Sequence, residues 1–194
     1  MALGRRGSRA AVRSLAVCLA VGTAAGAVIG GTLGRASMRL VFVADRGMRG
    51  FETSAGATVG QFTAGGTLAV YAAGLFVGLL LGLAYWVARP FLPGTRAIRA
   101  GVYTTAATLL GTALVVGDAR QDFAFVPPAL SVALIVVGIA LTALPVPLIA
   151  ERLAPSATRL PLRASLAVVA VVLVVLAAYA GLRVADALDE LRLV

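Results

Sequence analysis

Five long apolar segments constrain this chain more than any other feature of its sequence. The 194 residues are 60% hydrophobic and only 13% charged, and the segments lie at about 13–34, 64–88, 99–117, 129–150 and 162–183. A helix of roughly 20 apolar residues crosses the hydrocarbon core of a bilayer, whereas a soluble domain is nearer a quarter charged. The sequence therefore predicts an all-α membrane protein. We expect one domain, residues 1–194, in which about five transmembrane helices form a single bundle.

The arginines are divided unequally between the two ends of these segments. With a cytoplasmic N-terminus, ten arginines and a single acid, Glu151, face the cytoplasm, and seven arginines and seven acids face the other side. Because basic residues concentrate in cytoplasmic loops, the sequence predicts a cytoplasmic N-terminus and an extracytoplasmic C-terminus. This division also accounts for the net charge of +9, so the expected partner is a lipid bilayer and not nucleic acid.

The two ends of the first segment each leave an alternative open. Basic residues followed by an apolar stretch and "TAAGA" are also typical of a cleaved signal peptide. The glycine pattern described next continues past that site, which favours an uncleaved span. After the segment, residues 35–63 are predicted to form an extracytoplasmic cap, in which "RLVFVA" either makes a short strand or continues the first helix.

Glycine recurs every fourth residue in the first two segments. The first column is Gly22, Gly26, Gly30 and Gly34, and the second is Gly74, Gly78 and Gly82. A four-residue step keeps side-chain positions near one helical face, and small residues let helix backbones approach closely in lipid. We therefore predict that the first two spans pack through these columns. The alternative is that one column mediates oligomerisation, because the spacing does not choose the partner.

Arg35 and Arg39 follow the first glycine column, on the side that the charge distribution makes extracytoplasmic. They can end the apolar span, extend toward lipid phosphate or complement the C-terminal end of the helix dipole. The sharper hypothesis is an anion site formed by the two guanidinium groups, or an ion pair with Asp118 or Asp122 across the outer surface.

Polar and proline residues within the spans give further expectations. Thr104, Thr108 and Thr112 form a stripe that would join helices or line a narrow polar path. Pro145 and Pro147 should kink or break the fourth span. Tyr85 and Trp86, near the inner end of the second span, are typical of interfacial anchors.

The composition excludes several kinds of chemistry. There is no histidine and a single cysteine, Cys18, so an intrachain disulfide, a His/Cys zinc site and histidine acid–base catalysis are excluded. No acid or base lies near the middle of a predicted span, where ion-coupled carriers usually need one. We expect no metal, no cofactor and no catalytic residue.

The first 90 residues or so carry a resemblance of low specificity. "GRASMRL" at 34–40, "GQFTAGGTL" at 60–68 and the Gly74–Gly78 helix resemble uncharacterised actinobacterial multi-pass membrane proteins, in which an Arg-x-x-Met-Arg element follows a glycine-rich first helix. The resemblance implies a protein of the bacterial cytoplasmic (inner) membrane and implies no activity.

These observations favour a non-enzymatic role as an accessory, scaffold or small assembly subunit that contacts other membrane subunits or a second copy of itself. Two alternatives stay open. One is a small oligomeric transporter or channel. The other is a lipid-headgroup-binding protein or membrane enzyme that uses an outer charged cluster, made of Arg35, Arg39, Asp45, Arg46, Arg49 and Glu52.

Overall fold

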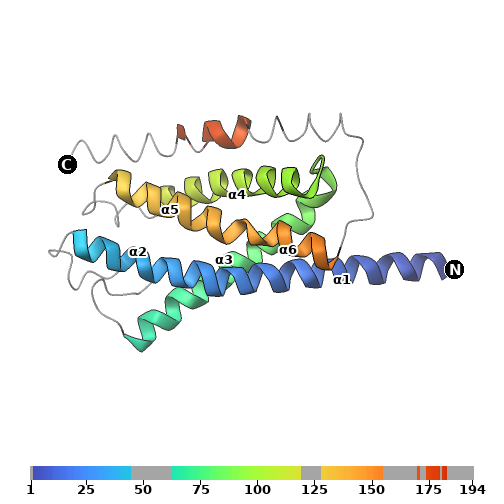
Figure 1. Ribbon diagram of the computed structural model, residues 1–194, viewed down its shortest axis with the longest axis horizontal. Helices are drawn as coiled ribbons and strands as arrows, with labels where there is room; N and C mark the ends of the chain where they lie inside the picture. The colour runs from blue at the N-terminus through green and yellow to red at the C-terminus, as the bar shows by residue number, and fades with distance from the viewer. Residues whose placement is uncertain are drawn as a thin grey trace.

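The computed structural model describes residues 2–44, 63–118 and 128–154, with short helical pieces at 170, 174–179 and 181–182. Every element in these residues is a helix. The first is a continuous helical rod made of α1 (Ala2–Ala25), the π-helical η1 (Gly26–Gly30) and α2 (Gly31–Ala44), which runs along one side of the molecule (Figure 1). The prediction of an all-helical chain is confirmed for the part that the structure describes.

The remaining helices run back and forth beside this rod (Figure 1). They are α3 (Ala64–Ala88), the short 3₁₀-helical η3 (Arg89–Phe91), α4 (Arg96–Asp118), α5 (Pro128–Ala143) and α6 (Pro145–Leu153). Thr63 begins α3 by accepting a hydrogen bond from the backbone N–H of Gly66, as is usual for an N-cap threonine. Gly94, at φ 77°, provides the left-handed residue of the turn between η3 and α4.

Four helical stretches among the described residues are long and apolar enough to cross a membrane: Ala10–Leu40, Ala64–Phe91, Arg96–Val115 and Leu130–Leu153. They correspond to the first four predicted spans. Most of the fifth predicted span, 162–183, lies outside the described residues. The count of five spans and the position of the C-terminus therefore stay predictions.

The first helix extends further than its apolar segment. Residues 35–44 belong to α2. Of the two alternatives for "RLVFVA", continuation of the first helix is therefore confirmed and the short strand is wrong, and the predicted cap does not begin at residue 35. The physical reason is that Arg35 and Arg39 end the run of apolar side chains without interrupting backbone hydrogen bonding, since arginine is a good helix former. Residues 45–62 lie outside the described part of the chain.

The fourth span is broken at Leu144, between α5 and α6. Pro145 and Pro147 have no backbone N–H, so neither can donate to a carbonyl one turn earlier. The N–H of Leu144 still bonds the carbonyl of Ala140 at 3.0 Å. After the break, α6 buries Val146, Pro147, Ala150 and Glu151. The buried residues on both sides of Leu144 follow one another at three- and four-residue steps, from Thr142 and Ala143 to Ala150 and Glu151, so the same face of the chain lies against the core before and after the predicted proline break.

The two glycine columns lie against each other where the rod crosses α3. A Cβ atom built on Gly22 would lie 2.8 Å from Gly82 Cα, and one built on Gly26 would lie 2.5 Å from Gly78 Cα. Such contacts are closer than real Cβ atoms make, and the atoms in the way are backbone. Only glycine fits these positions without moving a helix.

The C-terminal half of the first column meets different neighbours. A Cβ on Gly30 would lie 3.5 Å from Thr142 Oγ1, and one on Gly34 would lie 2.9 Å from the side chain of Val70. Between the two halves, η1 contains the wider π turn, and Gly31 turns toward the ring of Tyr71. The tightest glycine–glycine contacts are therefore those of Gly22 and Gly26 in the rod with Gly74, Gly78 and Gly82 in α3.

Candidate functional site at the charged helix ends

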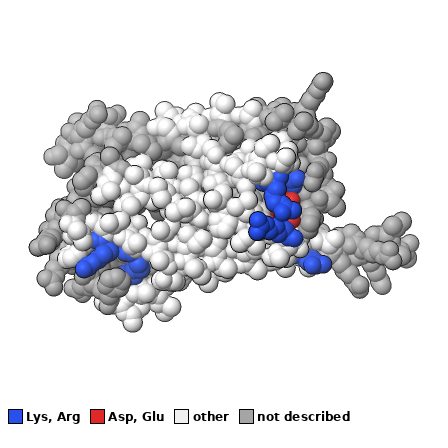
Figure 2. All heavy atoms as spheres, in the orientation of Figure 1, with Lys and Arg blue, Asp and Glu red and all other residues white. Residues whose placement is uncertain are grey.

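Charged side chains occupy the two ends of the bundle. On the face shown in Figure 2, one group of arginines surrounds an acid at one end, a second group lies at the other, and the surface between them is uncharged. In the rod, Arg13 and Arg35 are the charged residues at the two ends of the uncharged stretch. At 1.5 Å per residue they are about 33 Å apart, close to the thickness of the hydrocarbon core.

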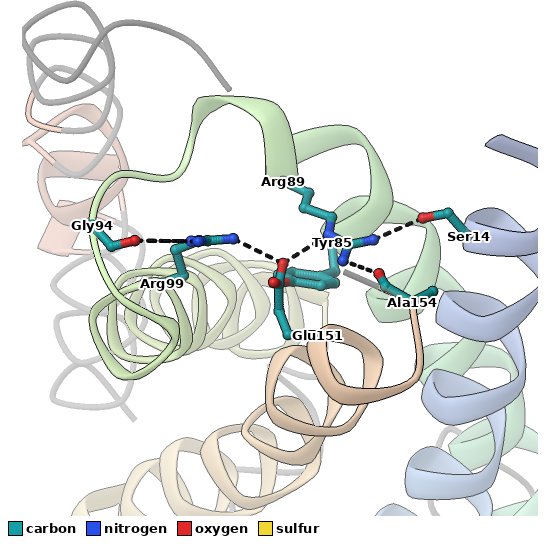
Figure 3. Close-up of polar contacts among 7 residues, drawn as sticks. All are labelled: Ser14, Tyr85, Arg89, Gly94, Arg99, Glu151 and Ala154. Atoms are coloured by element: carbon teal, nitrogen blue, oxygen red, sulfur yellow. Dashed lines mark hydrogen bonds and ion pairs between the residues drawn. The ribbon is translucent and has the colours of Figure 1, made fainter. Parts of the chain in front are cut away.

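The group around the acid is centred on Glu151 of α6 (Figure 3). Its Oε1 atom accepts hydrogen bonds from the hydroxyl of Tyr85 at 2.9 Å and from Nε of Arg89 at 2.7 Å. Nη1 of Arg99 forms an ion pair with the same oxygen at 3.0 Å. One carboxylate oxygen thus joins α3, η3, α4 and α6. We call Tyr85, Arg89, Arg99 and Glu151 the ion cluster.

Arg89 extends the ion cluster to the first helix. Its Nη1 donates to Ser14 Oγ of α1 at 2.7 Å, and its Nη2 donates to the backbone carbonyl of Ala154, directly after α6. This carbonyl is one of those that a helix end leaves without an intrahelical partner. The fork of donors on guanidinium explains why arginine suits the position: one side chain bonds three oxygens that belong to α1, α6 and the residue after α6.

The guanidinium group of Arg99 is held by the turn that precedes α4. Its Nε and Nη2 atoms both donate to the carbonyl of Gly94 at 3.2 Å, so the left-handed glycine also presents an acceptor to the arginine. This bond keeps the guanidinium beside Glu151 (Figure 3). The turn between η3 and α4 is therefore part of the site.

The ion cluster is almost completely buried. Arg89 and Arg99 are each 3% exposed and Glu151 is 4% exposed. Removing such groups from water costs several kcal/mol per ion, which only close pairing and additional hydrogen bonds repay. Two guanidinium groups and one carboxylate leave one excess positive charge at this end of the bundle. The contacts to Ser14, Gly94 and Ala154 supply neutral oxygen acceptors for the excess donors.

Two tyrosines support the ion cluster from the core side. Tyr85 is completely buried, and its ring meets that of Tyr103 edge to face, with 5.0 Å between centroids. The Tyr103 hydroxyl donates to the carbonyl of Leu81. The expectation that Tyr85 is an interfacial anchor is therefore wrong: its hydroxyl binds a carboxylate inside the protein instead of water at the membrane surface.

Arg35 and Arg39, the arginines singled out in the sequence, lie at the opposite end from the ion cluster. Nη2 of Arg35 donates to Thr67 Oγ1 at 2.8 Å, so this buried side chain joins α2 to the first turn of α3. Arg39 is exposed, and its guanidinium lies over the ring of Phe42 at 5.3 Å. The side chain of Asp118 and the whole of Asp122 lie outside the described part of the chain, so their pairing with Arg35 stays a prediction.

The ion cluster was not predicted from the sequence, although the sequence contains one signal for it. Glu151 is the single acid among ten arginines on the predicted cytoplasmic side. The predicted topology brings the end of the second span, the start of the third and the end of the fourth to that side. A carboxylate surrounded by arginines would find partners there, and Arg89 and Arg99 lie directly at the end of the second predicted span and at the start of the third.

No family model, curated protein or solved structure matches this chain. The chemistry of the ion cluster therefore has to be judged from its own geometry.

Proposed function

We propose that this chain is a non-enzymatic subunit of a bacterial cytoplasmic membrane assembly, with its N-terminus in the cytoplasm. It acts as a rigid helical scaffold for other membrane components. The observation that carries the proposal is the ion cluster: three donors share Glu151 Oε1, and each of the three belongs to a different helical element. A carboxylate oxygen bonded in this way holds helix ends together and is poorly placed to receive a substrate proton.

The packing of the two glycine columns against each other supports the same proposal. Gly22 and Gly26 of the rod contact the glycines of α3 inside one chain, so these surfaces contribute to the stiffness of the bundle. The opposite face of α3 presents large apolar side chains, among them Phe76 at 61% exposed. In a bilayer this face contacts lipid or another apolar helix.

Purification in a mild detergent, followed by quantitative mass spectrometry, tests the proposal. The wild-type chain should recover a second membrane polypeptide at constant stoichiometry. Glu151→Gln, which weakens the join between helix ends, should lose that polypeptide in proportion to the loss of folded bundle. Arg152→Gln is the matched control, because Arg152 is the exposed neighbour of Glu151 on the same helix and its substitution should leave recovery unchanged.

Other results of the same purification would favour the rival functions. A chain that purifies alone and carries a solute into proteoliposomes would replace the scaffold with a small transporter or channel. A chain that purifies with a stoichiometric anionic lipid, lost on Arg39→Gln, would favour headgroup binding at the outer end. Either result contradicts the scaffold proposal.

A further inference from the structure

Three threonines of α4 carry buried hydroxyl groups with no hydrogen-bond partner among the residues that the structure describes. Thr104, Thr108 and Thr112 follow one another at four-residue steps, and each Oγ1 is shielded from solvent without a hydrogen bond to any described residue. Thr112 as a whole is 5% exposed. A buried hydroxyl that makes no hydrogen bond costs free energy, so a group of three requires an explanation.

Other threonines in this bundle satisfy their hydroxyls locally. Thr142 donates to the carbonyl of Gly138 at 2.7 Å, and Thr67 donates to that of Thr63 at 2.8 Å. Both use the acceptor one turn earlier, the usual solution for threonine in a helix. The three α4 threonines lack this bond. Their hydroxyls are therefore available to a ligand.

The spacing and the charge of the stripe limit the kind of ligand. Residues four apart on a helix are about 6 Å apart along the axis. Two hydrogen bonds of about 2.8 Å from one water molecule fall short of this distance, so a short chain of water molecules is needed to join two neighbouring hydroxyls. Because no charged side chain lies between Arg99 and Asp118 of α4, the stripe offers no counter-charge to an ion. The chemistry fits a small neutral molecule that both donates and accepts hydrogen bonds.

The stripe borders a close contact between helices. A Cβ atom built on Gly111 would lie 3.0 Å from the side chain of Ile139 in α5. At 100° per residue, Thr104, Thr108 and Thr112 lie about 20°, 60° and 100° around the helix from Gly111. The hydroxyls thus follow one edge of the α4–α5 contact. Thr105, at about 120° from Gly111, lies just beyond Thr112 around the helix and is exposed.

We propose that the hydroxyls of Thr104, Thr108 and Thr112 bind a file of hydrogen-bonded water molecules that runs from one hydroxyl to the next. This site goes beyond the scaffold function and does not depend on it. Buried waters of this kind typically make about three hydrogen bonds to polar groups that would otherwise be unpaired. The file runs along the middle of α4, beginning about 7.5 Å along the helix axis from Arg99 of the ion cluster.

A crystal structure of the wild-type chain grown from a lipidic mesophase tests the water sites directly. We expect each of the three Oγ1 atoms to have an ordered water oxygen within about 3.2 Å, and neighbouring water oxygens to lie within the same distance of one another. Hydroxyls that instead donate to the carbonyls of Ala100, Thr104 and Thr108 would overturn the proposal, because each threonine would then be satisfied by its own helix.

A double-mutant cycle tests whether the waters form one connected file. Thr104 and Thr112 are about 12 Å apart along α4 and cannot touch, so coupling between them needs an intermediary. The unfolding equilibrium constants of Thr104→Val, Thr112→Val and the double variant should depart from simple multiplication by about threefold or more. This coupling should disappear in a Thr108→Val background and persist in the control Thr105→Val background. Multiplicative effects in every background would contradict a connected file.

Discussion

At the scale of single residues, Glu151 is the side chain on which most of the packing at the charged end depends. Its one oxygen receives Tyr85, Arg89 and Arg99. Replacing a buried ion pair by apolar groups is often neutral, but removing one partner leaves the other charge without compensation. Here the loss of one carboxylate would leave two buried guanidinium groups.

Glu151→Gln should therefore lower the free energy of unfolding by about 3–5 kcal/mol. The measurement is reversible unfolding in bicelles, followed by the fluorescence of Trp86. Arg152→Gln, next to it and exposed, should change the free energy of unfolding by no more than about 0.5 kcal/mol. Equal effects of the two substitutions would mean that the ion cluster contributes little beyond general surface charge.

The sequence predicted the positions of the charged residues better than their roles. It placed Glu151 and its arginines on one side of the membrane, but it directed attention to Arg35 and Arg39, because their side disfavours positive charge. The contacts between these side chains could not be predicted from the sequence. Arg89 bonds Glu151 and Ser14, which belong to other helices, and such distances depend on how the helices pack. Tyr85 was misassigned for the same reason.

At the scale of helices, the crossing of the rod and α3 depends on glycine at defined positions. Gly26→Ala would place a methyl group 2.5 Å from Gly78 Cα, so a helix must move. We expect the free energy of unfolding to fall by about 1–3 kcal/mol, the usual cost of overpacking. Gly101→Ala is the matched control, since a Cβ there has nothing within 4 Å.

Because alanine is the better helix former, Gly101→Ala should leave stability unchanged or raise it by up to about 1 kcal/mol. Denaturant unfolding of both variants in the same bicelles makes the comparison. A Gly26→Ala protein as stable as Gly101→Ala would show that the two helices do not cross at these glycines.

Helix boundaries were predictable where a local signal marks them. Thr63 caps α3, and Pro145 separates α5 from α6, each as residue chemistry requires. The end of α2 at Ala44 was not predictable from hydropathy, because charged residues end an apolar segment without ending a helix. The π-helical η1 was also missed. Its wider turn lies where the rod crosses α3, and the sequence carries no periodicity that distinguishes this turn from ordinary helix.

At the scale of the whole molecule, the predicted topology puts the ion cluster on the cytoplasmic side of the membrane. In an otherwise cysteine-free Cys18→Ala protein, a cysteine at exposed Thr95, between η3 and α4, should resist an impermeant maleimide in intact spheroplasts and react after lysis. A cysteine at exposed Ala64, at the start of α3, should react in both conditions. The reverse labelling pattern would place the N-terminus outside the cytoplasm and would contradict the topology predicted from the distribution of arginines.

Membership of a larger assembly is the central claim, and the mass of the particle in its native membrane tests it most directly. Native nanodiscs excised from the source membrane without detergent should release, in native mass spectrometry, a particle that contains the 19.6 kDa chain and a second polypeptide at a fixed ratio. Release of the 19.6 kDa chain alone, or only of multiples of it, would contradict the proposal that this bundle is a scaffold for other membrane proteins.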